Sequence, residues 1–137
     1  MSTTDDEIAI RALIMRAALV PDQGELSEYH ELYTEDGTWG VSGQPADEGV
    51  EKIIAAAAGR REAKTGGPGS GTRHLVFPMR ITVDGDTATG TTYLTLIGEA
   101  AGSPKILSFG VYTDRYVRTA DGWRIKERVI TPEALRK

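Results

Sequence analysis

The spacing of hydrophobic residues changes once along this chain, at the glycine-rich segment TGGPGSGT (residues 65–72). Before this segment, apolar residues recur every three or four positions, which is typical of amphipathic helices. After it, apolar and polar residues alternate, which is typical of strands joined by hairpins. Glycine and proline at this density do not form regular structure. The sequence therefore predicts helices first and a strongly twisted antiparallel sheet second, an α+β fold.

Three helices are expected in the first half. The segment TDDE forms a capping box that begins at Thr4, and Pro21 is expected to end the first helix. The second helix is short and covers residues 22–33, with Asp22 as its cap. The third covers residues 46–64. Each presents one apolar face, so all three can pack against the sheet.

The strands are separated by recognisable turn signals such as DGD and ADG. They are expected over residues 38–42, 72–83, 87–99, 105–119 and 123–130, the first of them after a turn at Asp36-Gly37. The strand 105–119 alternates clearly. Leucine, phenylalanine and valine share one face (Leu107, Phe109, Val111, Val117), and a mixed set shares the other (Ile106, Ser108, Gly110, Tyr112, Asp114, Tyr116).

Pro78 interrupts the strand that carries His74, one of two histidines in the chain. Under strict alternation, His74 and Val76 lie opposite the apolar residues that follow the proline. Proline in a strand often marks a bulge or an edge. A bulge at Pro78 would bring His74 and Val76 onto the face of Met79 and Ile81. Both arrangements are compatible with the sequence.

Composition narrows the functional classes. A chain of 137 residues is expected to form one domain, residues 1–137. It has no cysteine, which excludes thiolate catalysis and disulfides. The net charge is -4 and the basic residues are scattered, so no nucleic-acid partner is expected. There is no signal-like N-terminus and no apolar run long enough for a membrane span, so a cytoplasmic protein is expected.

The sequence lacks the common motifs for phosphate binding, metal binding and nucleophilic catalysis. The segment GGPGSGTR lacks the lysine of a phosphate-binding loop and precedes a strand rather than a helix. It is expected to be a flexible connector at the rim of a pocket. Two histidines without paired ligands do not suggest a metal site. No serine lies in a nucleophile elbow. The remaining possibility is acid–base chemistry.

Histidine titrates near neutral pH, and a carboxylate partner can fix its tautomer. Asp22 and Asp114 are the candidate partners of His74. Each residue also has a purely structural interpretation: Asp22 as a helix cap, His74 as a half-buried strand residue and Asp114 as one half of a cross-strand ion pair.

Several segments together resemble the SnoaL-like branch of the nuclear transport factor 2-like superfamily. They are DEGVEKI in the third helix, TRHLV at the start of the sheet, VDGD, and the series GVYTDRYVRTADGWRIKER. The resemblance covers nearly the whole chain. It implies a cone-shaped, curved antiparallel sheet wrapped around three N-terminal helices, with one deep, largely apolar pocket. It also implies that the protein forms a homodimer or homotrimer.

The resemblance is closest to the dehydratases of this superfamily, such as scytalone dehydratase and bile acid dehydratase. Their catalytic aspartate falls on Asp22 and their catalytic histidine on His74. Ketosteroid isomerase fits less well, because its oxyanion-hole acid falls on Asp114 but its base and its tyrosine fall on Val41 and Ala17.

The resemblance implies a small-molecule substrate and no cofactor or metal. The expected activity is a dehydratase, isomerase or polyketide-cyclase-like reaction, with His74 and Asp22 catalytic. Expected substrate-binding residues are Trp39, Tyr93, Tyr112 and Asp114, with Tyr112 or a neutral Asp114 holding an enolate oxygen. The alternative is a non-catalytic ligand-binding or assembly module, in which Asp22 would cap its helix without touching His74.

Overall fold

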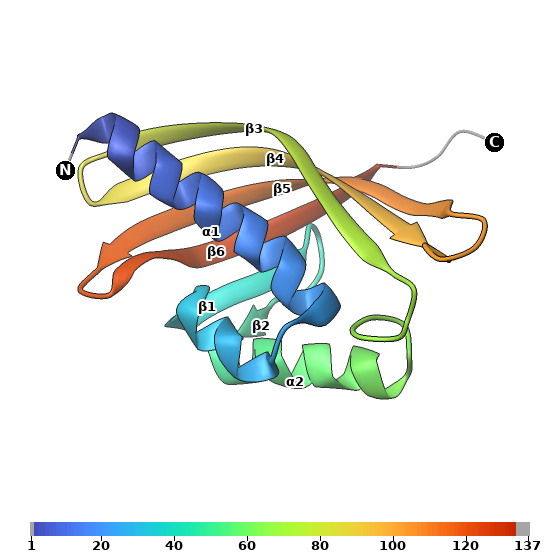
Figure 1. The fold of residues 1–137 in the computed structure, drawn as a ribbon. Coiled ribbons are helices and arrows are strands. Elements are labelled where there is room, and N and C mark those ends of the chain that lie inside the picture. The colour runs from blue at the N-terminus through green and yellow to red at the C-terminus, as the bar shows by residue number, and fades with distance from the viewer. Residues whose placement is uncertain (1, 134–137) are drawn as a thin grey trace.

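The computed structural model describes residues 2–133, and this part of the chain contains two α-helices, one 3-10 helix and six strands (Figure 1). In chain order they are α1 (Thr3–Gln23), η1 (Leu26–Glu31), β1 (Tyr33–Val41), β2 (Asp47–Glu48), α2 (Val50–Glu62), β3 (Arg73–Asp84), β4 (Thr87–Gly98), β5 (Lys105–Thr119) and β6 (Gly122–Glu133). Helical segments precede the long strands, so the predicted α+β class is confirmed.

The strands form one sheet in the order β2-β1-β6-β5-β4-β3. The expectation of a wholly antiparallel sheet was wrong, because β1 pairs parallel with β6 while all other neighbours are antiparallel. β1 lies between its antiparallel neighbour β2 and the last strand, β6, and no tight turn joins β1 to β6, so this pair can be parallel. Figure 1 shows the sheet curving around α1, with α2 beside β1 and β2.

Helix α1 continues past Pro21, which was expected to end it. Proline removes one N–H donor, yet the helix extends two residues further, to Gln23. The carbonyls exposed there gain another donor, because the Nη2 atom of Arg61 on α2 lies 3.0 Å from the Val20 oxygen and 2.8 Å from the Gly24 oxygen. At the other end the cap is Ser2 rather than Thr4.

The segment between α1 and α2 is less helical than expected. The predicted helix over residues 22–33 is reduced to η1, and Asp22 does not cap it, because Asp22 lies in the last turn of α1.

No turn forms at Asp36-Gly37. Instead β1 runs through this dipeptide, and its pairing with β6 shifts register between Tyr33 and Thr38. A side chain at Gly37 would approach backbone oxygens to 3.0 Å, which explains the glycine.

The mixed face of β5 is the inner one. Tyr112, Asp114 and Tyr116 are all 5% exposed or less, and the two tyrosines belong to the hydrophobic core. The opposite face of the sheet points outward and leaves large side chains exposed (Leu75, Phe77, Tyr93, Leu107, Phe109). Ile106 was expected on the inner face but is 52% exposed, because the register of β4 with β5 shifts between Leu96 and Ile97 and breaks the alternation there.

The bulge considered at Pro78 is present. Val76 pairs with Leu94 and Met79 with Thr92, so β3 holds one residue more than β4 between these two pairs. As a result, Val76 and Ile81 are both buried on the inner face although they are five positions apart, an odd offset that would put them on opposite faces of a regular strand. His74 shares this inner face and lines the pocket described below.

None of the helices within residues 2–133 has both the length and the apolar character to cross a bilayer.

Candidate functional site

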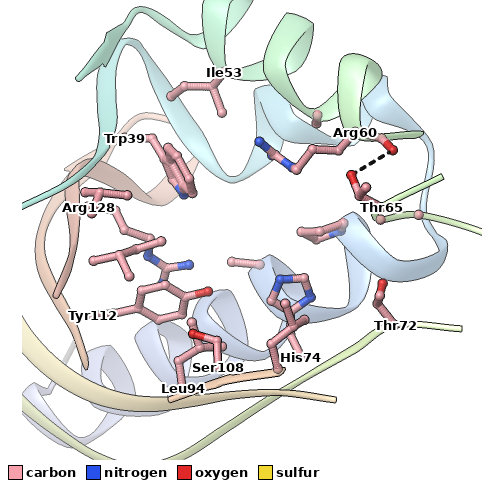
Figure 2. A pocket seen from close by; sticks show the side chains of 18 of the residues that line it. Trp39, Ile53, Arg60, Thr65, Thr72, His74, Leu94, Ser108, Tyr112 and Arg128 are labelled. Carbon is pink, nitrogen blue, oxygen red and sulfur yellow. Dashed lines mark hydrogen bonds between the residues drawn. The ribbon is translucent and has the colours of Figure 1, made fainter. Parts of the chain in front are cut away.

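A pocket of about 290 Å³ lies between the helices and the inner face of the sheet. Its walls come from α1, η1, α2, all the long strands and the glycine-rich segment before β3. Figure 2 shows His74 and Tyr112 entering the pocket from the sheet, while Ile53 and Arg60 enter from α2 on the opposite side. The pocket is therefore lined by residues far apart in the sequence.

Asp22 and His74 are in direct contact at one wall of this pocket. The Nδ1 atom of His74 lies 2.6 Å from Oδ1 of Asp22, and the backbone N–H of His74 donates to Oδ2 at 2.9 Å. The Asp22 side chain is 4% exposed and that of His74 is 23% exposed. One carboxylate thus fixes both the strand end and the ring, and only the ring reaches the pocket.

This contact fixes the tautomer of the imidazole. An ionised carboxylate can only accept hydrogen bonds. Nδ1 of His74 therefore carries the hydrogen that it donates to Asp22, and Nε2 keeps its lone pair. A neutral histidine held in this way presents a proton acceptor at its outer ring atom.

The glycine-rich segment supports the helix end that carries Asp22. Gly67 has a φ of +84°, and a Cβ atom there would lie 2.4 Å from Cγ of Arg61. Arg61 is the residue that donates to the last carbonyls of α1. Gly66 and Gly67 also line the pocket, at the place expected for this connector. A side chain at Gly67 would displace Arg61 and, through it, the turn that holds Asp22.

Asp114 forms the cross-strand ion pair that was its structural interpretation from the sequence, and it does not line the pocket. Its two carboxylate oxygens accept from Nε and Nη2 of Arg128, both at 2.9 Å, and Tyr116 donates to Oδ2 at 2.7 Å. All three residues are buried. Both oxygens of Asp114 are thus occupied by Arg128 and Tyr116 in the core. Asp114 lies behind the pocket wall and offers no free group to a substrate.

Arg128 is a pocket residue that the sequence did not single out. Burial alone would lower its pKa, but the charge of Asp114 and their hydrogen bonds raise the pKa well above the ordinary value for arginine. Its guanidinium carbon lies 3.9 Å from the centre of the Tyr112 ring. The one available signal was the alternation of β6, which places Arg128 on the same face as Ile130.

Tyr112 lines the pocket as expected, and its hydroxyl points toward the centre in Figure 2. Burial raises the pKa of Tyr112, so its hydroxyl remains protonated near neutral pH. Trp39 also lines the pocket, and the Arg60 guanidinium carbon lies 5.4 Å from its ring centre. Tyr93 does not line the pocket: its side chain is 55% exposed on the outer face of β4, because it is one residue out of phase with Leu94.

A comparison with protein families matches residues 2–129 to the SnoaL-like domain. A search of curated proteins finds no match.

Solved structures share the fold. An NTF2-like protein with a cystatin-like fold from Novosphingobium aromaticivorans is 27% identical, with a TM-score of 0.81 over 94% of this chain and 82% of that one. A protein of unknown function from Mycobacterium tuberculosis is 28% identical, with a TM-score of 0.81 over 97% and 79%. A Streptomyces avermitilis protein of the NTF2-like family, proposed to be a dehydratase, is 14% identical, with a TM-score of 0.79 over 96% and 99%.

Proposed function

This chain belongs to the SnoaL-like domain family, and from that premise we propose that it is an acid–base enzyme that needs no cofactor. Its substrate is a small, largely apolar carbonyl or hydroxy compound, and its reaction is a dehydration, an isomerisation or a related cyclisation. The main support for this proposal is the 2.6 Å distance between Nδ1 of His74 and Oδ1 of Asp22 at the wall of a pocket.

His74 is the proposed general base. Its Nε2 lone pair takes a proton from the carbon next to the substrate carbonyl, and the electron pair of that C–H bond moves into an enolate. The imidazolium then returns the proton, either to a departing β-hydroxyl, which leaves as water, or to another carbon. Asp22 acts as a positioning residue, because it fixes the tautomer of His74 and stabilises the ring when it is charged. A general base positioned in this way typically accelerates the reaction by ~10²- to 10⁴-fold.

Tyr112 and Arg128 are the proposed binding groups for the enolate oxygen. The Tyr112 hydroxyl is protonated and points into the pocket, and Arg128 adjoins it. Donors that are already fixed in position cost little reorganisation when negative charge develops. Asp114 acts behind them by holding the guanidinium in place. Trp39 and the apolar walls would contact the hydrocarbon part of the substrate.

Two reactions test this proposal without knowledge of the natural substrate. One is deuterium uptake from D₂O at the α carbon of 2-tetralone, followed by proton NMR. The other is loss of water from 3-hydroxy-1-indanone, followed by the absorbance of the enone. The wild-type protein is expected to accelerate at least one of them. His74→Ala and Asp22→Asn should each reduce that rate by ~10²- to 10⁴-fold.

The matched control is His30→Ala. His30 is the second histidine, it pairs with Glu51 at 3.2 Å, and its side chain is 49% exposed. This variant should keep the full rate. Asp22→Asn is informative because an amide NH₂ facing Nδ1 would favour the tautomer that lacks a free Nε2 lone pair. If the His74 and Asp22 variants kept the wild-type rate, the mechanism would be wrong, and a ligand-binding module would be the better description.

A further inference from the structure

The pocket is lined by three arginines, Arg60, Arg61 and Arg128, and by the imidazole of His74. No aspartate or glutamate lines the pocket within the described residues, so its permanent charges are all positive. This contrasts with the whole protein, whose net charge is -4. A concave site lined by one sign of charge concentrates ligands of the opposite sign.

Three of these four groups already have a partner behind the pocket wall. Asp22 accepts from His74, and Asp114 accepts twice from Arg128. Arg61 donates to carbonyl oxygens at the C-terminal end of α1, where the helix dipole is negative. Each of these three groups therefore already has a hydrogen-bond acceptor within the protein.

Arg60 is different. No carboxylate lies within ion-pair distance of its guanidinium among residues 2–133, and it stacks over the Trp39 ring instead. Figure 2 shows its side chain reaching from α2 across the pocket toward Trp39, opposite His74. The residue is exposed, so it lies at the mouth. Arginine presents a planar fork of donors that matches a carboxylate in two parallel hydrogen bonds.

We propose that the substrate of this pocket is an organic acid, and that Arg60 binds its carboxylate at the mouth. The apolar body of the acid lies along Trp39 and Ile53, and its reacting carbon lies near His74. The proposal rests on the acid–base function described above and adds the substrate class. Arg60 is then a specificity-determining residue that takes no part in proton transfer.

The test is a binding experiment with two ligands of the same shape. These are 2-naphthoate, which carries the carboxylate, and 2-naphthamide, which is uncharged. Their dissociation constants are measured at pH 7 by isothermal titration calorimetry for the wild-type protein, Arg60→Gln and the control Arg11→Gln. Arg11 is an exposed arginine on α1 that lies outside the pocket.

The wild-type protein should bind 2-naphthoate about 10- to 100-fold more tightly than 2-naphthamide, as expected for hydrogen bonds to a charged group. Arg60→Gln should reduce this preference to less than about threefold while leaving 2-naphthamide binding unchanged, and Arg11→Gln should retain it. Equal affinity of the wild-type protein for both ligands, a preference that survives in Arg60→Gln, or no binding of either ligand at millimolar concentration would each overturn the proposal.

The binding test of the substrate class can fail or succeed independently of the turnover test of the acid–base function. Binding of 2-naphthoate needs no proton transfer, so His74→Ala should keep the carboxylate preference although it loses turnover. If the preference were absent while His74→Ala still abolished exchange, the acid–base function would stand and the substrate class would be wrong. If the preference were present without any turnover, the site would bind organic acids without transforming them.

Discussion

Replacement of Asp114 by asparagine should destabilise the protein strongly, because it removes the charge opposite Arg128. The two residues face each other across β5 and β6 as direct register partners. Their side chains are 0% and 3% exposed. Asparagine has nearly the same shape, so the change tests the charge and the acceptor geometry rather than the packing.

The expected loss of stability follows from the burial of both side chains. Removing one partner of a buried ion pair leaves an uncompensated charge and typically costs about 3–5 kcal/mol. Unfolding entropy scales with chain length and is about 290 cal/mol/K for a chain of this size. The melting temperature of Asp114→Asn should therefore fall by about 10–17 °C.

Thermal unfolding followed by circular dichroism measures this shift. The control is Asp86→Asn, which removes a carboxylate from Arg118; the Asp86 side chain is 83% exposed. An exposed pair contributes at most about 1 kcal/mol, so this variant should lose less than about 4 °C. A drop of that small size in Asp114→Asn would refute the argument, because it would mean that Arg128 is hydrated or has another partner.

Two further predictions concern the ends of α1. The hydrogen bonds from Arg118 lower the pKa of Asp6, so this carboxylate stabilises the folded state above the ordinary carboxyl value of 3.8 and loses that effect as the pH falls through its lower folded value. The free energy of unfolding, measured with urea, should decrease on acidification below about pH 4, and Asp6→Asn should show a smaller decrease. Arg61→Ala removes the donor to the last carbonyls of α1 and should lower turnover with a stability loss of about 1–2 kcal/mol; unchanged turnover would show that this donor does not position Asp22.

Much of the fold could be read from the sequence because it depends on local periodicity. The predicted bounds of β5, residues 105–119, are those of the structure, since alternation and flanking turns define a strand without reference to its neighbours. The end of α1 was misplaced for the opposite reason. Pro21 is a local stop signal, but Arg61, distant in sequence, supplies the donor that the last turn lacks.

The candidate site likewise contains some features that could be expected from the sequence and some that could not. The contact of Asp22 with His74 was expected from the resemblance, and the structure places the two side chains together. Their role in catalysis stays a prediction, as do the oligomeric state and the cytoplasmic location. Arg128 was not expected in the pocket, because an isolated arginine in a strand is usually an exposed residue. Arg60 is exposed, as is usual for arginine, and only the packing of α2 against the sheet places it at the pocket mouth.

The sequence by itself determined where helices give way to the long strands, which side chains of β5 from Ser108 onward share a face, and that a histidine follows the glycine-rich segment. The tertiary structure decided which face is the inner one, because a period of two residues is the same for either choice. It also decided that Asp114 is paired and Tyr93 is exposed. The state of a buried charge depends on its cross-strand partner, and Arg128 becomes that partner only through the register of β5 with β6.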